Sequence, residues 1–515
     1  MLVRNGIRAI RPGFGWFLIA MSALGAALVA LCIRLYGPGL SPDSVGYISI
    51  ARNLASSGTY RNYSGGVAPE WPPLYPVLAA ILQKLTGIDA LITAGLINVL
   101  SHGLTVYASG QLLSRVARHS PLAKYLGTVA IAISPALLAV SVMAWTEPLF
   151  ICCTVMFLLA LHDIVAGESS ARLLVRLTLF AALAALTRYI GVVLIPVGVF
   201  IVLFFYAARP LKRLVISALL SLGALVPLGA WVWRNHRLTG TLMGSRSPSI
   251  FTLSDNLGFT LDTIKAWFLP EKVVAARYGL VIAVGLLGFL LWAFIRRRLD
   301  PPEARAAYAL PPFLLMLAYL TFLIVSSTTT AYDQISNRLV VPIYVPVVVL
   351  LMMGWDLLSA RWAGRAGTIL VACALAGAFL PWFLYMKDGT TRTVRTCTER
   401  GAGGYNTRYW RESALVAHLR TAGALANERI YTNGPDVLYM LTPFETGIFS
   451  PRKGSYNSPV TVAGKPKMQL PARLIWFNGI RRAYLYTVEE LRQYYYLTPV
   501  FQASDGAIYI VNDKS

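Results

Sequence analysis

Charged residues are scarce in this sequence, and acids are the scarcer of the two signs. Only 13% of the 515 residues are charged, with 23 Asp and Glu against 46 Lys and Arg. Soluble proteins carry about 25% charged residues. Because 56% of the chain is hydrophobic and its mean hydropathy is +0.59, the composition excludes a large soluble globule and predicts a polytopic membrane protein.

Cysteine is also scarce, and familiar catalytic motifs are missing. Four of the five cysteines lie in apolar runs and Cys397 stands alone in the hydrophilic tail, so their spacing predicts neither a disulfide framework nor a metal site. The sequence contains no HExxH, no phosphate-binding P-loop and no GxSxG nucleophile elbow. The chain therefore has no local signature of a zinc protease, a nucleotide hydrolase or a serine hydrolase.

The formal net charge of +23 does not indicate a nucleic-acid partner. Lys and Arg fall mainly between the apolar runs, where cytoplasmic loops of membrane proteins collect them, or in the tail. We interpret the charge as membrane topology combined with binding of an anionic ligand. The basic residues predicted on the cytoplasmic side, together with the basic N-terminus, are Arg115, Arg118, Lys124, Arg172, Arg176, Arg209, Lys212, Arg213, Arg296, Arg297, Arg298, Arg361 and Arg365.

Hydrophobic runs predict about eleven transmembrane helices at roughly 20 residues each. They lie near residues 14–36, 88–114, 121–143, 147–166, 171–187, 190–207, 213–234, 277–295, 308–327, 338–358 and 364–386. The first run is too long for the core of a signal peptide, so we expect it to remain as the first helix. Residues 71–85 are apolar but short and begin beside Pro72 and Pro73, which predicts a juxtamembrane or re-entrant helix.

The predicted fold is therefore an all-α polytopic membrane domain over residues 1–386, followed by a small α/β domain over residues 387–515. Loops 37–87 and 235–276, with the tail, are expected on the outer side, opposite the cytoplasmic N-terminus. In the tail, the predicted strands lie at residues 429–432, 473–477, 483–486 and 507–511, and the predicted helices lie near residues 411–422 and 488–495.

Residues 41–76 form the polar, turn-rich segment after the first span. Ser41 can cap a helix that begins at Pro42, and Tyr47, Ile50 and Leu54 recur at helical spacing. Asp43 would then lie in the first turn of this amphipathic helix. The segment is one of few places where the chain can hold water-dependent chemistry beside a bilayer.

Two acids lie in predicted outer turns. Asp43 and Glu147 both fit a plain helix-capping role, because a carboxylate near a helix N-terminus is stabilised by the helix dipole. The turn at Glu147 is so short, however, that this carboxylate must lie at or just inside the membrane surface, where an acid is costly without a partner. The residues alone leave both roles open.

Arginines mark the outer ends of three predicted spans, at Arg188, Arg234 and Arg338. Snorkelling to the interface explains most such arginines. Arg338 opens a helix, where the dipole is already positive, so it needs an anion such as Asp333 or a ligand phosphate nearby. Arg234 is followed by Asn235 and His236, a donor-rich group that can bind a phosphate through charge-assisted hydrogen bonds.

These residues resemble the polyprenyl-phosphate-sugar-dependent C-type glycosyltransferases, which have the GT-C fold. Within them, the branch of protein O-mannosyltransferases and aminoarabinose transferases is the most similar. The resemblance covers roughly residues 10–390 and is carried by Pro-Asp-Ser-x-x-Tyr at residues 42–47 and Pro-Pro-Leu-Tyr-Pro at residues 72–76. Further similar stretches are Thr146 to Leu149, Leu186 to Arg188, Arg234-Asn235 with Gly240, and Asn337-Arg338 with Pro342.

The resemblance implies an inverting transferase of a hexosyl or pentosyl group. It would move the sugar from a polyprenyl-phosphate donor to a hydroxyl of a lipid-, glycan- or protein-linked acceptor. The enzyme would contact membrane lipids and act at the periplasmic face of a bacterial inner membrane. Asp43 would be the general base, Glu147 a second acid near a divalent metal (Mg or Mn), and Arg188, Arg234 and Arg338 the phosphate ligands. Further site candidates are Tyr47, Tyr75, Asn235, His236 and Asp333. Many relatives have Asp-Glu where this chain has Asp43 alone, which leaves the need for a metal open.

Two other classes of protein remain as alternatives. A flippase or transporter of lipid-linked glycans predicts charged residues through the membrane and on both faces, whereas the candidates here gather on one face. An O-antigen ligase or polymerase, which uses a diphosphate-linked donor, would carry a large outer loop rich in Arg and His. The loop at residues 234–277 is only moderate in length, and His236 is its one histidine. The transferred sugar and its acceptor are open at this stage.

Overall fold

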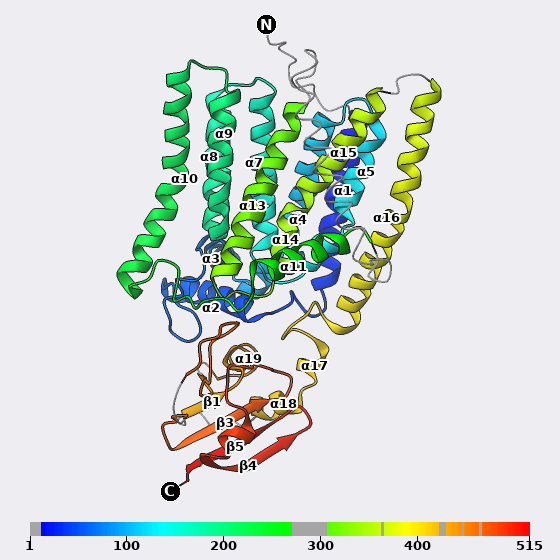
Figure 1. The fold of residues 1–515 in the computed structure, drawn as a ribbon. Helices are drawn as coiled ribbons and strands as arrows, with labels where there is room; N and C mark the ends of the chain where they lie inside the picture. Colours follow the sequence, from blue (N-terminus) through cyan, green and yellow to red (C-terminus); the bar gives the residue numbers. More distant parts are fainter. Residues whose placement is uncertain are drawn as a thin grey trace.

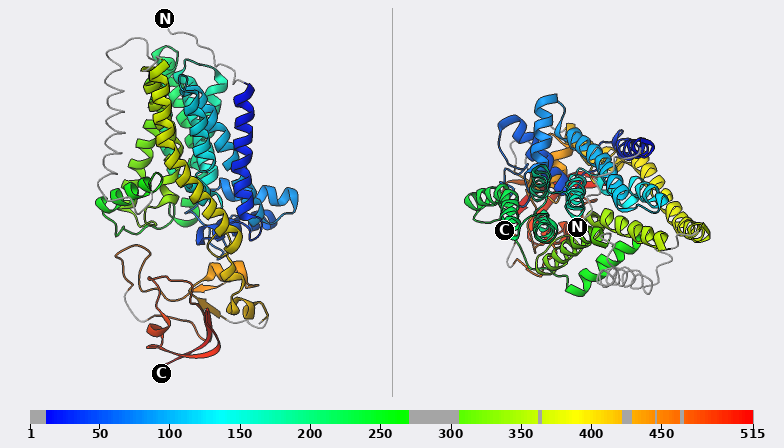
Figure 2. Two further views of the ribbon diagram at one scale, coloured as in Figure 1. Left: turned by 90° about the vertical axis from the view of Figure 1, so that its right-hand side faces the viewer. Right: turned by 90° about the horizontal axis from the view of Figure 1, so that it is seen from above.

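Long helices form one part of the molecule and a small sheet domain forms the other (Figure 1). The computed structural model describes residues 12–269, 306–361, 365–421, 429–444, 447–462 and 466–514. The helices run side by side, and the sheet domain lies against the end of the bundle opposite the N-terminus (Figures 1 and 2). This confirms the predicted class, a polytopic helical protein with a small C-terminal α/β domain.

The described helices of the first part confirm most of the predicted spans. They are α1 (Pro12–Ile33), α2 (Pro42–Ser57), α3 (Leu74–Thr86), α4 (Ala90–Val116), α5 (Pro121–Ala132), α6 (Pro135–Ser141), α7 (Glu147–Val165), α8 (Ala171–Thr187), η1 (Tyr189–Val193), α9 (Leu194–Phe205), α10 (Pro210–Thr239), α11 (Leu253–Ala266), η3 (Ala306–Ala309), α13 (Leu310–Thr329), α14 (Asn337–Val340), η4 (Val341–Ile343), α15 (Tyr344–Arg361) and α16 (Arg365–Arg400).

Among the described residues, seven helical segments are long and apolar enough to cross a membrane: Pro12–Ile33, Ala90–Val116, Pro121–Ser141, Glu147–Val165, Pro210–Thr239, Ala307–Thr329 and Asn337–Leu357. The helices α3 and α9, the latter with η1, are apolar but shorter. The segment over residues 71–85 is thus a short helix, as predicted. The predicted span at 277–295 and Arg296 to Arg298 lie outside the described residues.

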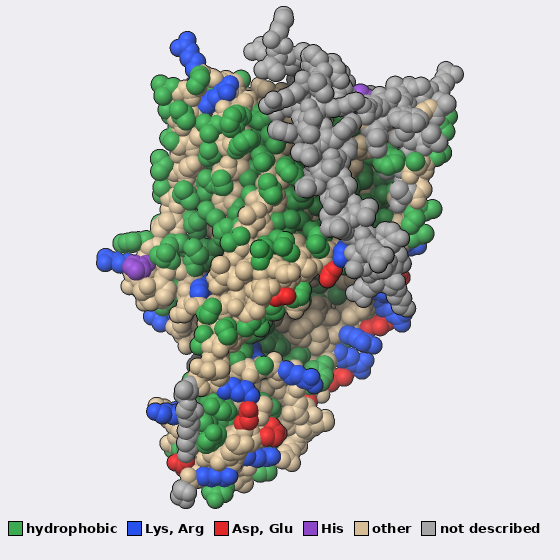
Figure 3. Space-filling view, viewed as in Figure 1, with side chains coloured by type: hydrophobic (Ala, Val, Ile, Leu, Met, Phe, Trp, Pro, Cys, Tyr) green, Lys and Arg blue, Asp and Glu red, His purple; other side chains and the backbone are tan. Residues whose placement is uncertain are grey.

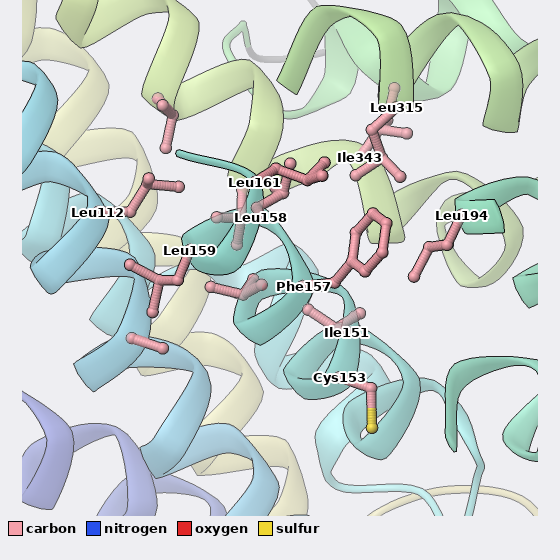
Figure 4. Packing of buried hydrophobic residues seen from close by; sticks show 14 of the residues in the cluster. Leu112, Ile151, Cys153, Phe157, Leu158, Leu159, Leu161, Leu194, Leu315 and Ile343 are labelled. Carbon is pink, nitrogen blue, oxygen red and sulfur yellow. The ribbon is translucent and has the colours of Figure 1, made fainter. Parts of the chain in front are cut away.

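Helix α7 is the centre of the helical core. Of its most apolar 18 residues, 83% are buried. The reason is that Phe157 and its neighbours on α7 contact α4, α9, α13 and η4 (Figure 4). A helix that is apolar on all sides is stable only when surrounded. The first residue of α7 is Glu147, so the most buried helix of the bundle positions one of the two predicted acids.

Helix α16 is longer than the span predicted at 364–386. It has 36 residues, which corresponds to about 54 Å, whereas the hydrocarbon core of a bilayer is about 30 Å thick. The helix continues through residue 386 to Arg400 and carries the chain to the sheet domain (Figure 2). The predicted domain boundary at 386 therefore falls inside a continuous helix.

The C-terminal domain contains a mixed five-stranded sheet in the order β2-β1-β3-β5-β4. The parallel pairs are β1 with β2 and with β3, and the antiparallel pairs are β3 with β5 and β5 with β4. Its elements are α17 (Arg408–Arg411), α18 (Ala414–Thr421), β1 (Arg429–Thr432), α19 (Pro435–Leu441), β2 (Ile448–Phe449), β3 (Ala472–Phe477), α20 (Val488–Leu491), β4 (Tyr495–Ala503) and β5 (Gly506–Asp513).

Two of the local predictions for this domain were wrong. The run 483–486 is not a strand: only Leu485 forms an isolated bridge, to Arg452. The helix predicted over 488–495 ends at Leu491, and Tyr495 begins strand β4, which was not predicted. The first error arises because aromatic content describes a half-buried surface and not a particular pairing. The second arises because the tyrosines from Tyr494 to Tyr496 suit a strand, which ends the helical pattern earlier than predicted.

A short extended segment between α1 and α2 joins the two parts. Gly39 forms a parallel bridge with Met143, and Leu40 forms one with Gly404. The Tyr405 backbone N–H donates to the Leu40 carbonyl oxygen at 2.9 Å. Because Asp43 follows this segment and Glu147 follows Met143, the first bridge brings the two predicted acids to the same place.

The junction predicts a sensitive glycine. Gly404 has φ +58°, and a Cβ atom there would overlap the Leu40 carbonyl oxygen. Gly404→Ala should therefore lower the free energy of unfolding for two reasons. The bridge to Leu40 is lost, and an alanine in the left-handed region costs about 1 kcal/mol. Gly240→Ala is the matched control, because Gly240 has φ +69° but open space around it. We expect a lower unfolding temperature in detergent for Gly404→Ala than for Gly240→Ala; equal values would contradict the role of the bridge.

Candidate active site

The first turn of α2 holds Asp43 at the surface of a cavity. Ser41 caps the helix: its Oγ accepts from the Ser44 backbone N–H at 3.3 Å, and the Ser44 Oγ accepts from the Ser41 N–H at 3.1 Å. The Trp145 Nε1 also donates to the Ser41 Oγ at 2.7 Å, which ties the start of α2 to the residues before α7. The cap and Pro42 at the first helical position are as predicted.

Asp43 and Glu147 meet at one guanidinium. The Arg338 Nη2 donates to the Asp43 Oδ2 at 2.7 Å, and its Nε donates to the Glu147 Oε1 at 2.7 Å. Arg188 pairs with the same Glu147 oxygen, and its Nη1 donates to the Thr146 Oγ1 at 3.1 Å. We call Asp43, Glu147, Arg188 and Arg338 the charge cluster.

The two acids of the charge cluster differ in exposure. The side chain of Glu147 is 0% exposed, whereas that of Asp43 is 34% exposed. A buried carboxylate needs its two arginines, because a buried charge that loses its partner costs about 3 to 5 kcal/mol. Glu147 is therefore the buried anchor of the arginines, and Asp43 is the acid that a ligand can reach.

Arg338 lies at the wall between two cavities. The Trp145 ring packs 4.4 Å from the Arg338 guanidinium carbon, in cation–π geometry. Its planar guanidinium can hold two carboxylates at once because its N–H groups form a fixed fork. Asp43, Asp333, Arg338 and Tyr456 line both cavities, so the charge cluster is accessible from two sides.

The inner cavity, about 410 Å³, lies among the ends of the helices that face the sheet domain. Its walls come from α2, the loop at residues 70–72, η1, α13 and the loop at residues 331–333. Its lining combines the cations Arg188 and Arg338 with the apolar side chains of Ile190, Phe322 and Leu323. This cavity can hold a molecule with a polar head and an apolar tail.

The interdomain cavity is larger, about 1,230 Å³, and lies between the helical part and the sheet domain. Figure 3 shows the surface hollowed in this region. Its sheet-domain wall includes Tyr405, Arg481 and Tyr484. A third cavity, about 800 Å³, lies between α6, α11 and α16, but no member of the charge cluster lines it, so we do not place the site there.

Two further predicted residues belong to the site and one does not. Tyr47 lines the inner cavity and is buried against the Trp71 ring; this burial raises the pKa of Tyr47, so its phenol stays protonated. Asp333 lines both cavities, with its Oδ2 at 3.6 Å from the Arg338 Nη1. Tyr75 instead packs behind Tyr47, where its hydroxyl contacts the Asn98 Oδ1 at 3.1 Å.

The structure does not bring the group around Arg234 to the charge cluster. The Arg234 guanidinium packs on the rings of Tyr60 and Trp231, at 5.1 Å and 4.5 Å, and Arg234 lines neither cavity at the charge cluster. Asn235 is buried and donates to the Tyr189 hydroxyl at 3.2 Å. His236 is exposed. Arg234 and Asn235 therefore fasten the end of α10, and the prediction that they contact the same ligand as Arg338 lacks geometric support.

Sequence reasoning missed two charged residues of the inner cavity. Glu70 precedes the Trp-Pro-Pro turn, and Arg246 follows α10 in an irregular loop. Burial raises the pKa of Glu70, and Arg246 opposes this change. Arg246 also packs 5.0 Å from the Tyr332 ring. Neither residue lies on a periodic element, so the only signal in the sequence was a charge within a polar outer loop.

The charge cluster does not fit a metal ion. Within the described residues, no group of three or more His, Cys, Asp or Glu side chains could hold one. A divalent metal near Glu147 would need several oxygen ligands, but the Arg338 guanidinium already lies between the Asp43 and Glu147 carboxylates. The cation that the two acids share is an arginine.

Glu70 makes stability depend on pH. Because its folded pKa is raised above the ordinary value of 4.5, its neutral form stabilises the fold at low pH, and this contribution is lost as the pH rises through the folded pKa. Glu70→Gln keeps the neutral shape at all pH values. We expect the unfolding temperature of Glu70→Gln to exceed that of the wild type, by a margin that grows as the pH rises from 4.5 through the folded pKa of Glu70. Parallel pH profiles for the two proteins would contradict the burial of Glu70.

Comparisons of sequence find no relatives for this chain: no protein-family model matches it, and no curated protein matches it. Comparisons of structure do find matches. ArnT from Cupriavidus metallidurans, bound to undecaprenyl phosphate, matches with a TM-score of 0.58 and 13% identity over 96% of this chain and 98% of ArnT.

Two other solved structures have the same architecture. Archaeal oligosaccharyltransferase AglB from Archaeoglobus fulgidus, in complex with an inhibitory peptide and a dolichol-phosphate, has a TM-score of 0.54 and 11% identity over 97% of this chain and 74% of AglB. Arabinofuranosyltransferase AftD from Mycobacteria has a TM-score of 0.53 and 14% identity over 98% of this chain and 42% of AftD. This chain therefore has the GT-C fold that ArnT, AglB and AftD share.

Proposed function

We propose that the chain is a membrane glycosyltransferase that moves a sugar from a polyprenyl phosphate to an acceptor hydroxyl. The observation that carries this proposal is the position of the charge cluster between two cavities. The donor lipid would enter the inner cavity, with its phosphate at the arginines and its apolar tail toward Phe322 and Leu323. The acceptor would reach Asp43 from the interdomain cavity. The undecaprenyl phosphate bound to ArnT supports a donor of this class.

The proposed reaction needs few catalytic groups. A sugar on a lipid phosphate is already activated, because the phosphate is a good leaving group. The acceptor oxygen forms a bond to the anomeric carbon while the bond from that carbon to the phosphate oxygen breaks, and its electron pair leaves with the phosphate. Asp43 accepts the proton of the acceptor hydroxyl. Attack from the side opposite the phosphate inverts the anomeric carbon.

Three arginines line the inner cavity and can hold the donor phosphate. Within the described residues, the Nε atom of Arg188 has no hydrogen-bond partner. The Nη1 atom of Arg338 is 3.6 Å from the nearest Asp333 oxygen, which is beyond hydrogen-bond length. Arg246 is exposed and reaches the same cavity. Donors fixed before the reaction stabilise the charge that develops on the phosphate as it leaves.

We also infer the orientation of the chain. The described basic residues at the C-terminal end of α4 and at the N-terminal ends of α8 and α10 lie on the side of the N-terminus, away from the sheet domain (Figure 1). Such residues collect on the cytoplasmic side of membrane proteins. The charge cluster and the sheet domain would then face the periplasm of a bacterial inner membrane, and the acceptor would be a lipid-, glycan- or protein-linked hydroxyl there.

The first test is consumption of a labelled donor. Purified protein in detergent is incubated with a panel of polyprenyl-phosphate sugars, with and without a chelator. We expect the wild type to consume one donor, if only by slow hydrolysis, and to lose no activity with chelator, because no metal step is part of the proposal. Asp43→Asn should lower turnover by about 100-fold or more, the contribution of a positioned base, while exposed Asp388→Asn serves as the matched control.

The assay separates the alternatives. Turnover of Asp43→Asn within about threefold of the wild type would remove the base from the proposal. Consumption of a diphosphate-linked donor alone would favour a ligase or polymerase. If folded protein consumes no donor but moves lipid-linked glycan across proteoliposome membranes, the chain is a transporter.

A second test compares Arg234, which the sequence predicts as a phosphate ligand, with Arg246, which it does not. Arg246 lines the inner cavity, whereas Arg234 packs on Tyr60 and Trp231 outside it. Arg246→Ala should raise the KM for donor by about tenfold, the effect of losing one charge-assisted hydrogen bond, with kcat less affected. Arg234→Ala should leave the donor KM within about twofold of wild type. The reverse ranking would place the phosphate elsewhere.

A further inference from the structure

One loop of the sheet domain, which contains Tyr456 and Asn457, contacts Asp333 beside the charge cluster. The Tyr456 hydroxyl donates to the Asp333 Oδ1 at 2.7 Å. The other oxygen of Asp333 lies 3.6 Å from the Arg338 Nη1. A chain of polar groups therefore runs from the C-terminal domain through Asp333 to the guanidinium that holds both acids of the charge cluster.

The tip of this loop is fastened to the helical part at more than one point. The Asn457 Nδ2 donates to the Tyr332 carbonyl at 2.9 Å, and the Asn457 carbonyl accepts from the Ile250 N–H at 3.3 Å. Asn457 has φ +44°, a left-handed conformation that Asn tolerates better than most residues. A strained residue held by contacts on both sides marks a position that the surrounding structure determines.

Asp333 can compete with an anionic ligand for Arg338. Its carboxylate is half-exposed, lines both cavities, and would need to move by less than 1 Å to form an ion pair of ordinary length, about 2.8 Å. The hydrogen bond from Tyr456 holds one carboxylate oxygen on the other side. Partial burial, together with this bond, raises the pKa of Tyr456, so the phenol keeps the proton that it donates.

We propose that Tyr456 is a positioning residue that holds the Asp333 carboxylate away from Arg338, so that the Arg338 Nη1 stays available to the phosphate of a lipid ligand. The proposal rests on the proposed function, because it assumes a phosphate in the inner cavity. It assigns to the sheet domain a direct part in donor binding. Without the phenol, Asp333 turns to Arg338 and competes with the phosphate.

The test measures binding of undecaprenyl phosphate, without transfer, by the shift in unfolding temperature of the full chain in detergent. Tyr456→Phe removes only the hydroxyl and should weaken binding by about fivefold, as expected for one lost hydrogen bond. Asp333→Asn removes the competing charge, so the double variant Tyr456→Phe with Asp333→Asn should bind within about twofold of Asp333→Asn alone. Tyr496→Phe, an exposed tyrosine on β4, is the matched control.

The outcomes are distinct. Rescue by Asp333→Asn supports the proposal, because a loop that merely lost its fold would not regain binding when a second residue changes. Unaltered binding by Tyr456→Phe overturns it. A double variant that keeps the whole defect of Tyr456→Phe also overturns it, since the phenol would then act without Asp333. Failure of the wild type to bind undecaprenyl phosphate would instead count against the proposed function.

Discussion

The Arg338 guanidinium is the group on which the site depends. It holds a partly exposed carboxylate with one nitrogen and a fully buried carboxylate with another, both at 2.7 Å. Taking ions out of water costs several kcal/mol each, and this cost is offset only when geometry and hydrogen bonds are good. Arg188 and Thr146 supply those bonds around Glu147. One guanidinium therefore fixes the positions of both carboxylates.

Backbone pairing brings these groups together from distant parts of the sequence. The bridge from Gly39 to Met143 sets α2 beside α7, and the bridge from Leu40 to Gly404 sets both beside the sheet domain. Because α7 is surrounded by other helices, its first residue cannot shift without disturbing the core. The position of Asp43 thus depends on a well-buried helix, although Asp43 itself is partly open to solvent.

The sequence predicted the elements better than the directions of side chains. The cap at Ser41, the turn at Glu147 and the positions of Arg188 and Arg338 at helix ends follow from local rules, because caps, turns and span ends are local. Arg234 shows the limit: its place at a span end resembles that of Arg338, but its side chain packs on Tyr60 and Trp231, a partner choice made by tertiary packing. Glu70 and Arg246 could not be found because irregular loops carry no periodic signal.

The length of α16 has a consequence for the spacing of the two parts of the molecule. The helix continues past the membrane-spanning stretch by residues 387–400, about 20 Å of rigid rod, and ends where Gly403 and Tyr405 are bonded to Leu40. The sheet domain is therefore joined to the helical part by a continuous helix and not by a flexible linker. Residues 387–400 thus set the spacing between the two parts of the molecule, and this spacing sets the size of the interdomain cavity between them.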